Sequence, residues 1–120
     1  MANVLVDTSV WVDYLRSGDS KLTSLLNSNQ VVTHPMIIGE LACGHLKNRK
    51  SLMTLWSSLS SLAPASQEEV LYYIEHHRLM GKGIGYVDAH LLASATLAAD
   101  LKLWTNDKRL ANLASSLTLN

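Results

Sequence analysis

Two carboxylates occupy positions where an α/β fold places its chemistry. Asp7 directly follows the short apolar run at residues 4–6, and Asp107 follows a second apolar run that ends at Trp104. The first run is rich in β-branched residues and reads as a buried strand, and residues 101–104 read as a further strand. Because active sites of parallel α/β sheets lie at the carboxyl ends of the strands, we expect Asp7 and Asp107 to lie near each other.

Two further acids belong to predicted helices. Glu40 lies inside the apolar stretch at residues 36–42, and Asp88 lies in the first turn of an Ala-rich helix. A carboxylate in a first turn is favoured by the helix dipole. Charged side chains are rarely buried without a partner, so Glu40 in its apolar stretch calls for a compensating cation.

The four carboxylates predict a site for a divalent metal. Like charges that converge raise each other's pKa, and a divalent cation removes that cost. Oxygen donors without His or Cys suit a hard ion, Mg²⁺ or Mn²⁺. Such an ion can activate water and screen the charge that develops on a phosphodiester, so the pattern favours chemistry on phosphate esters.

Strands that alternate with helices predict an α/β fold of three layers (α/β/α). Its central, mostly parallel sheet would have four or five short strands, within one domain at residues 1–120. We expect strands at residues 4–6, 30–33, near 63, 101–104 and, at an edge, 117–119. We expect helices from Thr8 or Ser9 to 15, at 21–26, from Pro35, and at 51–59, 66–80, 87–99 and 108–114.

Composition limits the classes of function. The chain has 120 residues, 48% of them apolar, and a formal net charge of zero. Proteins that bind nucleic acid by bulk electrostatics usually carry a strong basic excess, so if nucleic acid is the partner, a local patch, a metal or a second copy of the chain must supply the binding. The single cysteine, Cys43, fits a reducing compartment. With no signal peptide or membrane segment recognised, we expect a cytoplasmic protein.

The four acids lie in blocks that together resemble the PIN domain. Within that family, the chain is most similar to the VapC toxins of bacterial toxin–antitoxin pairs. The resemblance covers nearly the whole chain in the family's order. The blocks are VLVDTSVW at residues 4–11, IGEL at 38–41, GYVDAHLLASA at 85–95 and LWTNDKRL at 103–110.

The resemblance implies one PIN-like domain that acts as a Mg²⁺-dependent endoribonuclease. Its catalytic acids would be Asp7, Glu40, Asp88 and Asp107, with Asp7, Asp88 and Asp107 as the metal ligands. Ser9 and Thr105 match small polar positions whose hydroxyls would hydrogen-bond carboxylates or metal-bound waters. The family also implies a homodimer and a VapB-like antitoxin whose tail covers the site.

Other interpretations stay open at this point. Asp7 could cap a helix, Asp88 could be a dipole-stabilised first-turn residue, and Asp107 could be a turn residue. The whole fold could serve as a nucleic-acid-binding module, a structure-specific DNA nuclease or a phosphoacceptor domain. His34 could approach the site, whereas Cys43 reads as a small core residue. The basic clusters at 47–50 and 108–109 read as solvated charge that could touch phosphates.

Overall fold

The computed structural model describes residues 2–120 and contains, in that range, four strands and seven helices. The strands are β1 (Asn3–Val6), β2 (Val31–Thr33), β3 (Ser60–Ser61) and β4 (Leu101–Trp104). The helices are α1 (Thr8–Ser17), α2 (Ser20–Asn27), α3 (Pro35–Ala42), α4 (Arg49–Ser58), α5 (Gln67–His76), α6 (Tyr86–Leu97) and α7 (Lys108–Ser116).

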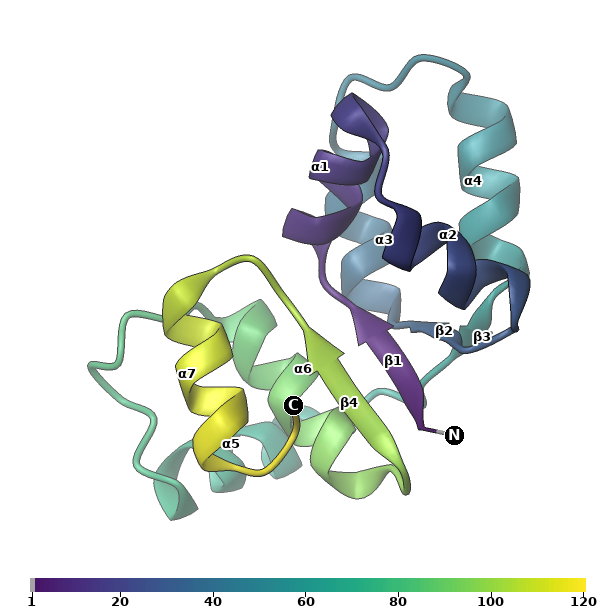
Figure 1. The fold of residues 1–120 in the computed structure, drawn as a ribbon. Helices are drawn as coiled ribbons and strands as arrows, with labels where there is room; N and C mark the ends of the chain where they lie inside the picture. The colour runs from purple at the N-terminus through teal and green to yellow at the C-terminus, as the bar shows by residue number, and fades with distance from the viewer. Residues whose placement is uncertain (1) are drawn as a thin grey trace.

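The four strands form one sheet in the order β3-β2-β1-β4, and every neighbouring pair is parallel. Figure 1 shows α1–α4 at the upper right of the strands and α5–α7 at the lower left. The α/β prediction with a central sheet flanked by helices is therefore confirmed, with four strands. The strand expected near residue 63 lies slightly earlier, as β3.

The expected edge strand at residues 117–119 is wrong. Leu117 caps the end of α7, and Thr118 adopts a left-handed backbone conformation with a φ of +60°. The chain then returns to β4 by a single backbone hydrogen bond, which Leu103 N–H donates to the Leu119 carbonyl. The left-handed turn interrupts the extended backbone that a strand requires, so the apolar alternation there serves packing alone.

Helix α5 ends earlier than its apolar spacing predicted. The capping box at its start is confirmed, because the Ser66 and Glu69 side chains each accept the other's backbone N–H. Its last residue is His76, and Arg78 then adopts a φ of +53°. Leu79 is nevertheless buried, so the apolar spacing that predicted a longer helix continues into the loop after α5.

The strand register determines which residues meet at the carboxyl edge of the sheet. Val6 pairs with Trp104 in the parallel ladder between β1 and β4. The next residues along the two strands are Asp7 and Thr105, which therefore leave the sheet side by side. The chain passes from β1 to β2 on one side, whereas β4 lies on the other, so this edge is a topological switch point.

The hydrophobic core holds the helices onto the sheet. Trp11 of α1 and Trp56 of α4 are fully buried and meet edge to face, with ring centroids 5.8 Å apart. On the other side, α6 buries small residues such as Ala89 and Ala93, which allow close approach to the sheet. Within residues 2–120, no helix has the length and apolar character needed to cross a membrane.

Candidate active site

Asp7 is the buried centre of the carboxylate group, with a side chain that is 6% exposed. Its backbone N–H donates to the Trp104 carbonyl at 2.9 Å and so continues the β1–β4 ladder. It occupies the N-cap position of α1, but its side chain makes no capping hydrogen bond. Instead, Oδ2 accepts the hydroxyl protons of Ser9 at 2.9 Å and Thr105 at 2.7 Å. Helix capping therefore does not explain this carboxylate.

The same two hydroxyls also accept hydrogen bonds from the backbone of the loop after β4. Ser9 Oγ accepts the Asn106 backbone N–H at 3.0 Å, and Thr105 Oγ1 accepts the Asp107 N–H at 3.1 Å. The Asn106 side-chain amide donates to Asp13 Oδ2 at 2.7 Å. The segment that carries Asp107 is thus held against the start of α1, beside Asp7.

Asp107 combines a structural role with an open position. Its Oδ1 accepts the backbone N–H of Leu110 at 3.1 Å and so caps α7, a role different from the turn residue considered from the sequence. Within residues 2–120, Oδ2 accepts no hydrogen bond, and the side chain is exposed. One oxygen therefore positions the carboxylate and the other remains available to a ligand.

Asp88 is half-buried in the first turn of α6, and the other three acids affect its pKa. Burial raises its pKa, and the negative charges of Asp7, Asp107 and Glu40 raise it further. A hydrogen bond from the Gly85 N–H, at 3.3 Å, opposes this shift. The four carboxylates therefore share one electrostatic environment although they come from four different segments of the chain.

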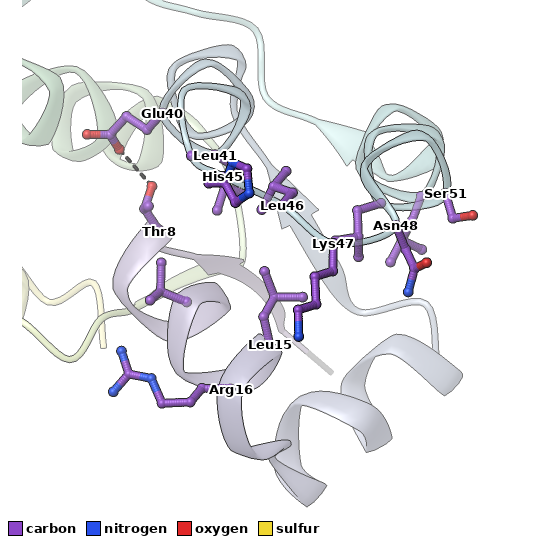
Figure 2. A pocket seen from close by; sticks show the side chains of 14 residues that line it. Thr8, Leu15, Arg16, Glu40, Leu41, His45, Leu46, Lys47, Asn48 and Ser51 are labelled. Carbon is purple, nitrogen blue, oxygen red and sulfur yellow. Dashed lines mark hydrogen bonds between the residues drawn. The ribbon is translucent and has the colours of Figure 1, made fainter.

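Glu40 lies on the exposed side of α3, which corrects the expectation that it needs a cation to offset burial. The apolar neighbours Ile37 and Leu41 face the core, and the helical period turns Glu40 outward. Its Oε1 accepts the hydroxyl proton of Thr8 at 2.7 Å, which links α3 to the first turn of α1. Figure 2 shows this bond at one end of a cleft.

The donor set suits a hard divalent cation. All four groups offer oxygen, and a cation would offset the like charge that raises the pKa of Asp88. In the described part of the chain, no three His, Cys, Asp or Glu side chains stand close enough together to hold a metal ion. Mg²⁺ is usually bound through one or two carboxylates, several waters and substrate phosphates, so a closed protein cage is not required.

His34 does not approach the carboxylates. It is fully buried, its Nδ1 accepts the Met36 N–H at 3.0 Å, and its Nε2 bonds to Ser94 Oγ at 3.1 Å. It therefore caps α3 from within the core. Cys43 is exposed at the end of α3, so its assignment to the core is wrong; helix α3 ends there and leaves it outside the packed layer.

The two basic clusters differ in role. Arg49 donates to the carbonyls of Ala42 at 2.7 Å and Gly44 at 3.2 Å, which closes the end of α3. Lys108 and Arg109 are exposed in the first turn of α7, beside Asp107. Only this second cluster directly adjoins one of the four acids in sequence.

Sequence reasoning missed two residues that organise the site, Thr8 and Asn106. Both lie next to acids that were recognised, within the short sequences Asp-Thr-Ser and Thr-Asn-Asp. Their polar side chains at the ends of strands were the available signal. Their partners Glu40 and Asp13 lie 32 and 93 residues away in the chain, so neither contact follows from local spacing.

The chain matches known proteins over almost its full length. The PIN domain family matches residues 4–115. Over 107 residues, the chain is 43% identical to Ribonuclease VapC32 of Mycobacterium tuberculosis, in strain H37Rv and in strain CDC 1551 / Oshkosh. The alignment covers 89% of this chain and 86% of that protein.

A solved structure shares the fold. The crystal structure of PAE2754 from Pyrobaculum aerophilum superposes with a TM-score of 0.66, covering 99% of this chain and 97% of that one. Sequence identity is 17%, so this likeness supports the fold alone. With an all-parallel sheet, acids at its carboxyl edge and a family match along most of its length, the chain belongs to the PIN-domain family and is a VapC homologue.

Proposed function

We propose that the protein is a Mg²⁺-dependent endoribonuclease and the toxin of a type II toxin–antitoxin pair, with Mn²⁺ as a possible substitute. It would act in the cytoplasm, where its RNA substrate is found. The geometry at the carboxyl edge of the sheet carries the proposal: Asp7 leaves β1 beside Thr105, and the Ser9 and Thr105 hydroxyls hold its Oδ2. The charges of Asp107 and Glu40 reach Asp88 together with that of Asp7. The similarity to Ribonuclease VapC32 supports RNA as the substrate.

Each acid has a distinct part in this proposal. Asp7, Asp88 and Asp107 would hold the ion, in part through its bound waters, and the ion would supply water activation and charge neutralisation when bound. Ser9 and Thr105 donate hydrogen bonds to Asp7 Oδ2, which fixes the orientation of the carboxylate and leaves Oδ1 free to bind the ion. Glu40 is anchored through Oε1, which leaves Oε2 to hold a proton from the attacking water.

Asp88→Asn provides the sharpest test of the catalytic role. It preserves shape and removes one charge, and Asn can still accept the Gly85 N–H. Because such residues act as a unit, RNA cleavage should fall by roughly a thousandfold or more, and expression without antitoxin should no longer halt growth. EDTA should stop wild-type cleavage, and excess Mg²⁺ should restore it.

Asp100→Asn is the matched control. Asp100 is exposed, lies outside the four acids and has a φ of +52°, a left-handed conformation that Asn tolerates well. It loses the same charge, so it should remain toxic and active. Toxicity of Asp88→Asn, or cleavage that persists in EDTA, would contradict the metal-nuclease proposal. Cleavage of DNA but not RNA would favour the DNA-nuclease alternative.

A cleft beside the site offers a place for the antitoxin. It has a volume of about 990 Å³, lies between α1, α3 and α4, and includes Thr8 and Glu40 in its lining (Figure 2). Most of its lining is apolar, and Val12 and Leu15 are exposed there. We propose that an antitoxin segment lies in this cleft with apolar side chains. Its Arg or Lys would reach the carboxylates, since an arginine fork matches them bidentately.

Leu15→Glu tests the cleft as the antitoxin site. A charge placed in an apolar contact should weaken antitoxin binding at least tenfold, measured by calorimetry, while RNA cleavage is retained. Met80→Glu is the control, because Met80 is 51% exposed in the loop after α5 and lies outside the cleft. A toxin–antitoxin structure in which all four acids remain open to solvent would contradict the proposed arrangement.

A further inference from the structure

Arg109 is placed by an unusually close contact with a glycine. Gly83 lies in the loop before α6 and has a φ of +81°. A Cβ atom at Gly83 would lie 2.6 Å from Arg109 Cδ and 2.9 Å from both Nε and Nη1. Real Cβ atoms do not approach other atoms so closely, so the absence of a side chain at Gly83 makes room for the guanidinium.

This contact brings a cation to the border of the carboxylate group. Arg109 follows Asp107 by two positions, and Gly83 precedes Gly85, whose N–H binds Asp88, by two positions. The Arg109 side chain is exposed, and within residues 2–120 no hydrogen bond joins its nitrogens to another group. The guanidinium thus lies against Gly83, close in the chain to the segments that carry Asp107 and Asp88.

We propose that Arg109 binds a phosphate of the RNA strand beside the scissile bond; this inference rests on the proposed ribonuclease function. The chain has no net charge, and four carboxylates repel a polyanion, so the strand needs a cation at the site's edge. A guanidinium without a hydrogen-bond partner in the protein is planar and can donate two parallel hydrogen bonds to phosphate oxygens.

Two variants that each remove one positive charge distinguish a specific phosphate contact at Arg109 from general attraction to a basic surface. The probe is a short fluorescent single-stranded oligoribonucleotide, with anisotropy measured in EDTA to prevent cleavage, over a series of salt concentrations. Arg109→Gln should weaken binding roughly tenfold and lower the salt slope by about 0.7, which corresponds to one lost phosphate contact. Lys108→Gln removes the same charge from the neighbouring position and should have a clearly smaller effect.

Two glycine variants test the contact while the charge is kept. Gly83→Ala forces the guanidinium away and should weaken binding of the oligoribonucleotide severalfold. Gly81→Ala is the control, because Gly81 has a similar φ of +72° but has nothing within 4 Å of an added Cβ. Both variants carry the same backbone strain, so the difference between them reports the displaced arginine.

The outcomes distinguish this inference from the proposed function. If wild type cleaves RNA but Arg109→Gln binds the probe with unchanged affinity and slope, the Arg109 assignment is overturned and the ribonuclease stands. Equal losses in Arg109→Gln and Lys108→Gln, or in Gly83→Ala and Gly81→Ala, would also overturn it. If the wild type neither binds nor cleaves RNA, both fail together. Circular dichroism and thermal melts of each variant confirm folding before binding is measured.

Discussion

Acidification should destabilise the protein through His34. The ring is fully buried, and its Nδ1 accepts a backbone N–H from Met36, so that nitrogen carries no proton. Nε2 then carries the proton and donates it to Ser94 Oγ. Burial, together with the nearby His90, lowers the pKa of His34 to about 4. The folded state thus requires a neutral ring.

The sign and size of the effect follow from the two pKa values. The unfolded chain has a His pKa of about 6.5, so between pH 6.5 and pH 4 the unfolded state binds more protons than the folded state. The stability that His34 contributes is complete above pH 6.5 and is lost as the pH falls towards 4. At pH 5 the loss is about 2 kcal/mol, and its limit below pH 4 is about 3 kcal/mol.

Urea unfolding of wild type and His34→Asn at pH 7 and pH 5 measures the contribution of His34 to the free energy of unfolding. Asn is a favoured N-cap residue and does not titrate, so it can replace the bond to Met36 while it removes the proton site. We expect wild type to lose about 2 kcal/mol more than His34→Asn between the two pH values. The comparison cancels the titration of the other groups.

A matched control uses a histidine on the surface. His76 is exposed near the end of α5, so His76→Asn makes the same replacement without touching the buried ring. If wild type and His34→Asn lose equal stability between pH 7 and pH 5, the buried neutral ring is not the cause, and the reasoning from burial fails.

Two further predictions concern the metal and the assembly. Mg²⁺ or Mn²⁺ should raise the melting temperature through preferential binding to the folded state, and Asp7→Asn should reduce that rise; equal shifts in thermal melts would remove Asp7 from the site. The protein should form a homodimer at micromolar concentration, and we place the contact at Tyr72 and Leu97, which are 68% and 69% exposed. Charge favours an antiparallel pair of α5 helices, because Glu68 lies in the first turn of α5 and Arg78 follows its end. Light scattering should then show a dimer for wild type and a monomer for Tyr72→Glu, and a monomeric wild type would contradict the assembly.

Local signals in the sequence were sufficient for most of the fold. The apolar run that ends at Asp7, the glycine that ends α1 at position 18 and the capping box of α5 each depend on residues within a few positions of one another. Such signals predicted the α/β class and the order of elements. The end of α5 at His76 could not be read from local signals. Leu79 lies at helical spacing from the apolar residues of α5 and is buried, but it belongs to the loop that follows the helix.

The candidate site shows the same division more sharply. The types of its acids and the strands that precede them were readable from the sequence, together with the family resemblance. The partners were not: Thr105 reaches Asp7 across 98 residues, and Thr8 reaches Glu40 across 32. These contacts depend on the register of β1 against β4 and on how α3 packs beside α1. The candidate chemical residues could thus be named from the amino-acid order, whereas the oxygen of each carboxylate that accepts a hydrogen bond depends on the packed fold. The physical reason is that hydrogen bonds require contact in space, which neighbouring residues secure through local geometry and distant ones only through the packed fold.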